Sequence, residues 1–180
     1  MSGGAPASDD SGNVYVSTGN GTFAPTGDRS PGYGDSVLKL DPTTGLNVVD
    51  SFTPWNQDQL DVADADLGSG GVMLLPDQSS PHPHLMITGG KAGTIYLMDR
   101  DDLGGFQRCG ETCDDVVQIE AIGPVFSTPA YFNGLLYYQS CCGDVLQAFQ
   151  LFHGQLSPVS LSSTPFGFPG ATPSISANGS

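Results

Sequence analysis

The chain repeats one short motif three times, and the first copy is Val37-Leu38-Lys39-Leu40-Asp41, followed by a turn that ends in Gly45. The other copies are Ile95-Tyr96-Leu97-Met98-Asp99 before Gly104 and Leu146-Gln147-Ala148-Phe149-Gln150 before Gly154. Each copy has the length of a short strand, and each is preceded by another apolar run. Strand-length runs separated by glycine turns are typical of β-structure. The motif therefore predicts an all-β fold built from a repeated unit.

The length of the unit indicates which β fold it belongs to. Ser127-Thr128-Pro129-Ala130 recurs as Ala171-Thr172-Pro173-Ser174, 44 residues later. A four-stranded unit of about 40–50 residues is the signature of a β-propeller blade. We therefore expect a β-propeller fragment of about three four-stranded blades, with longer loops at 22–35, 55–70 and 100–115. The expected blades are 5–66, 67–124 and 125–169, with the start of a further blade at 170–180.

The composition of the chain excludes some classes of binding partner. The 180 residues include 25 Gly and 14 Pro, and 19 acidic residues against 5 basic ones give a net charge of −14. So few cations argue against nucleic-acid binding, and no apolar run is long enough for a membrane span. The first residues lack the basic and apolar regions of a signal peptide. Because three blades leave open edges, we expect the rest of a propeller, or self-association, to cover them.

Several segments resemble the pyrroloquinoline-quinone (PQQ) repeat. They are residues 14–21, Arg29-Ser30-Pro31-Gly32, residues 36–45 and Gly93-Thr94-Ile95-Tyr96-Leu97-Met98-Asp99-Arg100. This family includes the eight-bladed quinoprotein alcohol dehydrogenases and also propellers that bind no cofactor. The resemblance implies an eight-bladed bacterial parent, periplasmic or extracellular, related to PQQ-dependent alcohol or sugar oxidoreductases.

The resemblance also implies site residues. Asn20, in Thr18-Gly19-Asn20-Gly21, stands where the dehydrogenases place a Ca²⁺ ligand. Asp64 stands where they place the catalytic base, with Asp66 beside it as a further metal ligand, and Lys91 where a cation contacts the quinone. In that mechanism Ca²⁺ and the cation polarise the quinone while the Asp takes the proton of the alcohol. Ca²⁺ and PQQ are therefore the expected cofactors of the full-length parent.

Each of these residues also has a structural interpretation. Asn20 between two glycines suits a turn, Lys91 suits a hairpin, and the acidic run from Asp58 to Asp66 suits a solvated loop. Ala63 and Ala65 stand where the dehydrogenases have aromatic residues. These replacements favour the alternative function, a non-catalytic propeller scaffold that binds proteins or saccharides.

The cysteines and histidines complete the candidate residues. A disulfide between Cys109 and Cys113 suits an extracytoplasmic compartment, and free thiols are the alternative. Some quinoprotein dehydrogenases carry a vicinal disulfide beside the quinone, but in a different blade context. We therefore expect Cys141 and Cys142 to be free or loop-stapling thiols. The segment His82-Pro83-His84 is interpreted as structural rather than as a metal pair.

Overall fold

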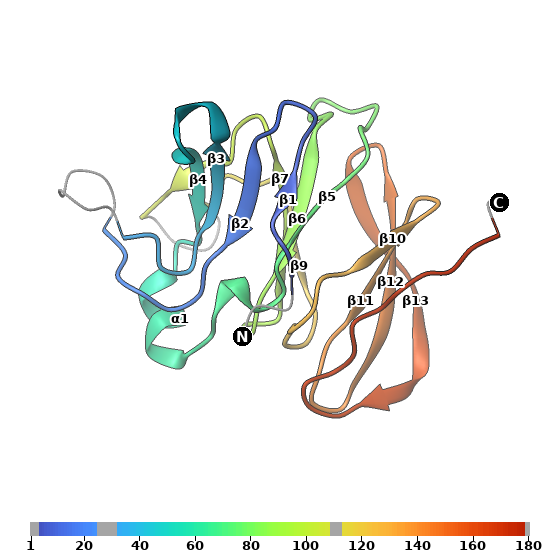
Figure 1. Ribbon diagram of the computed structural model, residues 1–180. Helices are drawn as coiled ribbons and strands as arrows, with labels where there is room; N and C mark the ends of the chain where they lie inside the picture. The colour runs from blue at the N-terminus through green and yellow to red at the C-terminus, as the bar shows by residue number, and fades with distance from the viewer. Residues whose placement is uncertain (1–3, 25–31, 109–112, 179–180) are drawn as a thin grey trace.

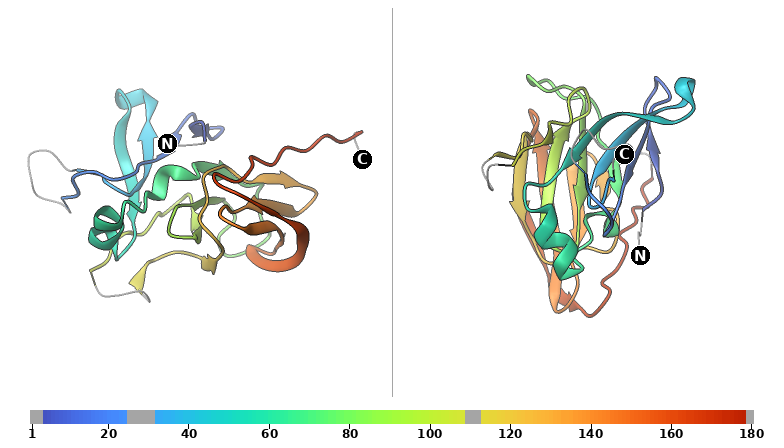
Figure 2. Two further views of the ribbon diagram at one scale, coloured as in Figure 1. Left: turned by 90° about the horizontal axis from the view of Figure 1, so that it is seen from below. Right: turned by 90° about the vertical axis from the view of Figure 1, so that its left-hand side faces the viewer.

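A computed structural model describes residues 4–24, 32–108 and 113–178. Its strands form three sheets that lie next to one another in chain order (Figure 1). The right-hand view of Figure 2 looks along this stack, with the first sheet nearest the viewer. The all-β prediction is confirmed. In the described residues no sheet closes on itself, and the propeller blades stay a prediction.

The first sheet consists of a four-stranded meander and one further strand that comes later in the sequence. Its four antiparallel strands are joined by a parallel strand, β8, which lies in the sequence between the third and fourth strands of the second sheet and pairs with β4. The turn between β3 and β4 contains the short 3₁₀ helix η1, Pro42–Thr44, in which the backbone N–H of Thr43 donates to the capping Asp41 side chain. The strands are β1 (Ala7–Ser8), β2 (Val14–Ser17), β3 (Val37–Asp41), β4 (Asn47–Thr53) and β8 (Gly105–Phe106).

The second and third sheets each contain four antiparallel strands in chain order. The second sheet consists of β5 (Val72–Leu74), β6 (Leu85–Gly89), β7 (Thr94–Asp99) and β9 (Gln118–Ala121). The third consists of β10 (Ala130–Phe132), β11 (Leu135–Gln139), β12 (Asp144–Phe152) and β13 (Gln155–Phe166).

The second sheet is buried on both faces. Alternate residues of β7 point in opposite directions, so Ile95 and Leu97 join a core shared with the third sheet. Tyr96 and Met98 join a second core shared with the first sheet, where Phe52 packs against Tyr96. The alternation of two apolar sets explains why this strand is apolar throughout, as in other sheets covered on both sides.

The predicted loop at 55–70 contains two helices, which corrects that expectation. They are α1, Gln57–Ala63, and the 3₁₀ helix η2, Leu67–Ser69. Helix α1 buries Leu60 and ends at Asp64, whose left-handed φ of 53° stops the helix. In the described ranges, the longest helix has seven residues, and none could span a lipid bilayer. Helix α1 lies at the lower end of the sheets in Figure 1.

Candidate functional site

Three segments far apart in the sequence meet where β2 and β6 end. Asn20 follows β2, Asp66 follows α1, and Lys91 lies in the turn between β6 and β7. The backbone N–H of Asn20 donates to Asp66 Oδ1 at 2.8 Å, and Lys91 Nζ lies 2.5 Å from Asp66 Oδ2. The structure thus brings together residues that the sequence analysis selected, and Asp66 is at their centre. We call Asn20, Asp64, Asp66 and Lys91 the acidic-end cluster.

Two glycines allow this close approach. A Cβ atom on Gly19 would lie 2.3 Å from Asp66 Oδ1, and one on Gly90 would lie 2.7 Å from the Asp66 carbonyl oxygen. Both distances are far below van der Waals contact, so a side chain at either position would push the segments apart. The backbone N–H of Lys91 donates to the same Asp66 carbonyl at 3.1 Å, which fixes the turn against the start of η2.

The central ion pair is largely shielded from solvent. The side chains of Asp66 and Lys91 are 17% and 20% exposed. Burial alone would raise the pKa of the Asp66 carboxyl, but the bonds from Lys91 and from the Asn20 N–H outweigh it and lower the pKa below 3.8. The hydrogen bond to Asp66 in turn raises the pKa of Lys91. Both groups are therefore charged at neutral pH.

The other members of the cluster lie nearer the solvent. Asp64 is 80% exposed, and its carboxylate lies 3.3 Å from Lys91 Nζ, which also donates to the Asp64 carbonyl at 3.0 Å. Asn20 Nδ2 donates to the Asp61 carbonyl at 2.9 Å, which leaves its amide oxygen as an acceptor. Asp61 also accepts from the backbone N–H of Gly21, so α1 and the turn after β2 are joined at two points.

A buried carboxylate beside the cluster was missed in the sequence analysis. Asp35 is fully buried, with its backbone N–H bonded to Gly19 and one carboxylate oxygen accepting from the Leu67 N–H at 3.1 Å. The other oxygen has no hydrogen-bond partner of good geometry among the described residues, although the buried Gln57 side chain is close enough to lower the pKa of the carboxyl. Burial, the largest influence, raises the pKa of this carboxyl, and the nearby charges of Asp66 and Asp61 add to it. The backbone of Asp35 is left-handed, with a φ of 49°, and no pattern in the surrounding sequence indicates that this residue is buried.

We tested these oxygens against the Ca²⁺ ion that the family resemblance implies. Ca²⁺ takes 6–8 oxygen ligands, and the second Asp35 oxygen and the amide oxygen of Asn20 are of the chemical type that it binds. Both oxygens of Asp66 are already engaged, so a metal-ligand role there requires Lys91 to move. Among the described residues, no group of three or more His, Cys, Asp or Glu is arranged to hold a metal.

The cysteines and histidines lie elsewhere. Cys141 and Cys142 form a disulfide, which excludes free thiols for this pair and leaves the loop-stapling alternative. Cys113 is also disulfide-bonded, while Cys109 lies outside the described residues, and the predicted Cys109–Cys113 bond stays a prediction.

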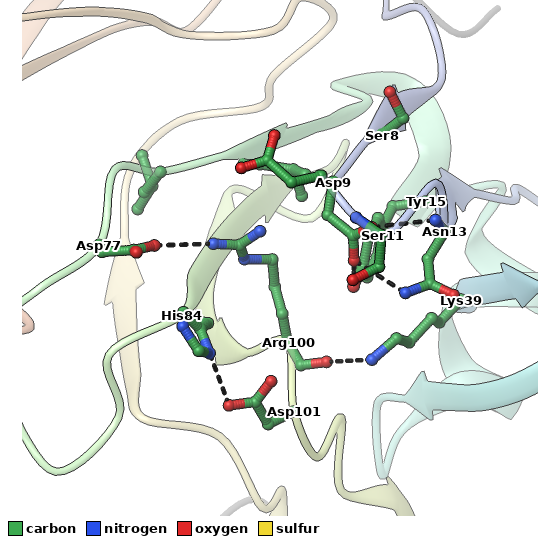
Figure 3. Close-up of a pocket in the computed structure, with 13 residues that line it drawn as sticks. Ser8, Asp9, Ser11, Asn13, Tyr15, Lys39, Asp77, His84, Arg100 and Asp101 are labelled. Atoms are coloured by element: carbon green, nitrogen blue, oxygen red, sulfur yellow. Dashed lines mark hydrogen bonds and ion pairs between the residues drawn. The ribbon is translucent and has the colours of Figure 1, made fainter.

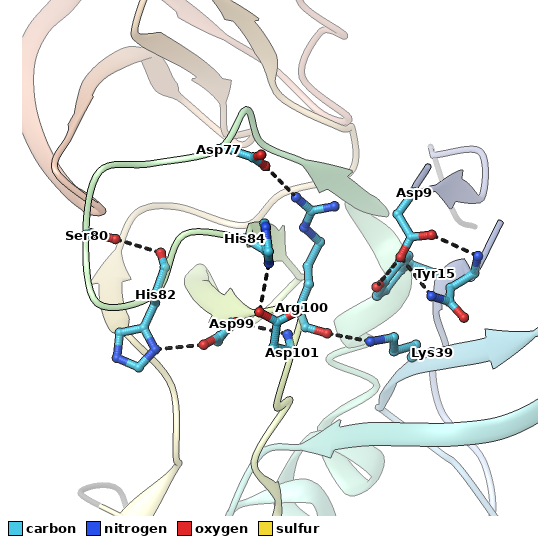
Figure 4. Close-up of polar contacts among 11 residues, drawn as sticks. Asp9, Tyr15, Lys39, Asp77, Ser80, His82, His84, Asp99, Arg100 and Asp101 are labelled. Atoms are coloured by element: carbon cyan, nitrogen blue, oxygen red, sulfur yellow. Dashed lines mark hydrogen bonds and ion pairs between the residues drawn. The ribbon is translucent and has the colours of Figure 1, made fainter. Parts of the chain in front are cut away.

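The two histidines of the His82-Pro83-His84 segment do not converge on one point. His82 Nδ1 lies 2.7 Å from Asp99 and His84 Nδ1 lies 2.8 Å from Asp101, as Figure 4 shows. Each ring therefore has its own carboxylate partner, in agreement with a structural interpretation.

The roles of Asn20, Asp64, Asp66 and Lys91 in binding or catalysis stay predictions. What the structure adds is their proximity, together with the buried Asp35. Comparison of the chain with family models, with curated proteins and with solved structures gave no match.

Proposed function

We propose that the chain is a quinoprotein-like β-propeller protein related to PQQ-dependent alcohol or sugar oxidoreductases, with Ca²⁺ and PQQ held at the acidic-end cluster. One observation carries the proposal. Residues chosen for a single site from their order in the sequence, at positions 20, 64–66 and 91, lie within hydrogen-bond or ion-pair distance of Asp66 or of one another.

The chain's own residues divide into three roles in this proposal. Asn20 and Asp35 supply oxygens to the ion. Lys91 presents a cation to the acidic cofactor and is held in place by Asp66. The exposed Asp64 carboxylate accepts the proton of a substrate hydroxyl. PQQ, when bound, supplies the electron acceptor for the oxidation.

We also propose an oxidising compartment, periplasmic or extracellular. The disulfide between Cys141 and Cys142 supports it, because disulfides persist outside the reducing cytosol. The remaining sheet edges are proposed to be covered by further blades or by self-association.

The proposal is tested by thermal unfolding with PQQ, Ca²⁺ or both. A site filled at about 100 times its dissociation constant adds about 2.7 kcal/mol to the free energy of unfolding. For a chain of this length, that corresponds to a rise in Tm of about 5–11 °C. We expect this rise in the wild type with PQQ and Ca²⁺ together, and a much smaller one in Lys91→Ala.

Asp58→Asn is the matched control. Asp58 is an exposed carboxylate on α1, the helix that ends at Asp64, and it takes no part in the acidic-end cluster. It should keep the full shift. An unchanged Tm in the wild type, or an equal rise in Lys91→Ala, contradicts the cofactor site and leaves the non-catalytic scaffold as the better hypothesis.

A further inference from the structure

A second polar site lies at the opposite end of the same strands. A cavity of about 440 Å³ opens between the turn from β1 to β2, the loop from β5 to β6 and the residues that follow β7 (Figure 3). Its volume is within the range of small-molecule sites, about 300–1,000 Å³. The acidic-end cluster takes no part in this cavity, and the sequence motifs that contain Lys39, His84 and Arg100 gave these residues no binding role.

The cavity contains hydrogen-bond donors that are not fully used. The Arg100 side chain is only 12% exposed, and its Nη2 lies 3.4 Å from Asp77. Its Nε is buried and has no hydrogen-bond partner among the residues that the structure describes. Lys39 Nζ donates to the Arg100 carbonyl at 2.8 Å, so two of the three N–H groups of the Lys39 ammonium remain available. Because Nε is closed to solvent, a ligand would reach Arg100 through its Nη groups, of which only Nη2 has a side-chain partner among the described residues.

Carboxylates beside these donors supply acceptors. Asp77 and Asp101 are 73% and 59% exposed, and each has one contact, to Arg100 and to His84. Their remaining oxygens face no donor in the described residues. Figure 4 shows Asp77 at the guanidinium end of Arg100, and Asp101 beside His84 near the backbone of Arg100.

A third carboxylate of the cavity, Asp9, already accepts several hydrogen bonds from its own turn and from Tyr15. Asp9 accepts from the Tyr15 hydroxyl at 3.0 Å and also from Asn13 and the Ser11 N–H. These bonds outweigh burial and lower the pKa of Asp9. Asp9 therefore stays ionised and fixes the turn that forms one wall of the cavity.

The distribution of charge selects the class of ligand. Four aspartates and two cations line the cavity, and the whole chain carries a charge of −14, so an anionic ligand is repelled. An apolar ligand would displace water from the Arg100 Nη groups and the exposed aspartates without replacing its hydrogen bonds. A hydroxyl group can accept from Arg100 or Lys39 and donate to Asp77 or Asp101 at the same time.

We propose that this cavity binds a neutral polyhydroxylated ligand, a saccharide, with neighbouring hydroxyls held between Arg100 and Asp77. The proposal does not depend on the cofactor site, which lies at the other end of the strands.

The test uses the wild-type chain and the methyl glycosides of glucose, galactose and mannose in ligand-observed NMR titrations. We expect saturable binding of at least one glycoside at concentrations up to about 10 mM. Arg100→Lys keeps the charge but removes the two Nη groups, and should weaken binding at least about tenfold. Asp77→Asn should also weaken binding, and it removes an exposed group, so it reports on the ligand even if the Arg100 variant fails to fold.

His82→Gln is the matched control, because His82 is bonded to Asp99 and does not line this cavity. Its affinity should equal that of the wild type. Absence of binding for all three glycosides overturns the proposal, and so does binding that is insensitive to both cavity variants. Tighter binding of the dicarboxylate glutarate than of any glycoside, sensitive to the same variants, also overturns it in favour of an anion site.

Discussion

The ion pair between Lys91 and Asp66 should contribute measurably to stability, and Lys91→Met removes its cation while keeping the length of the side chain. Both partners are at most 20% exposed and 2.5 Å apart. A hydrogen bond to a charged group in such surroundings contributes about 1.5–3 kcal/mol. The contact of Lys91 with Asp64 is longer, 3.3 Å, and Asp64 is 80% exposed, so that pair should contribute about 0.2–1 kcal/mol.

Two double-mutant cycles separate these contributions. Urea unfolding of Lys91→Met, Asp66→Asn and their combination gives one coupling energy, and replacing Asp66→Asn by Asp64→Asn gives the control. We expect a coupling of about 2 kcal/mol for Asp66 and less than about 1 kcal/mol for Asp64. Equal coupling in the two cycles would refute the assignment of Asp66 as the centre of the cluster.

The same pair predicts a dependence on pH. The folded pKa of Asp66 is depressed, so its contribution is present above the unfolded value of 3.8 and is lost as pH falls through the lower folded pKa. The difference in stability between the wild type and Lys91→Met should therefore be constant from pH 7 to 5 and shrink below 3.8. A difference that shrinks already between pH 7 and 5 would contradict this reasoning.

Three further substitutions test other parts of the structure by urea unfolding. Tyr15→Phe removes a hydroxyl that donates a hydrogen bond and should cost about 1 kcal/mol, whereas Tyr138→Phe removes a buried hydroxyl without a partner among the described residues and should be neutral or stabilising. Gly90→Ala places a Cβ 2.7 Å from a backbone oxygen and should cost about 1–3 kcal/mol, whereas Gly167→Ala has open space and should stay within about 0.5 kcal/mol. Burial raises the folded pKa of Asp35, so the stability gained from its neutral form is present below pH 3.8 and is lost as pH rises through the raised pKa. Asp35→Asn should therefore gain stability over the wild type between pH 4 and pH 7, and an equal difference at both pH values would contradict the buried-charge argument.

The strands could be predicted because their information is local. In β7 the alternation of Ile95 and Leu97 with Tyr96 and Met98 gives the period of a strand, and the glycine turns mark its ends. The meeting of Asn20 with Lys91 also follows from local rules, since each lies where a strand of neighbouring sheets ends at the same edge.

The remaining features depend on contacts between distant residues. Helix α1 has one buried apolar side chain, Leu60, and no apolar stripe, so tertiary packing decides that it forms. Asp35 is identified as unusual only by its burial against Leu67. The polar cavity needs Lys39 and Arg100, which belong to two copies of the repeated segment, and nothing in either copy indicates that the two residues meet.

Strand β8 determines when the first sheet can be completed during synthesis of the chain. It covers β4, yet its residues, Gly105–Phe106, leave the ribosome only after all of β5, β6 and β7. The same connection bonds Leu103 to Asp50 and Asp114 to the backbone of Trp55. The first sheet therefore remains unfinished during synthesis until most of the second has emerged, and its open edge is exposed to mispairing in that interval. In the finished protein the two sheets share one cooperative unit, so amide protons of β4 and β7 should exchange with solvent together.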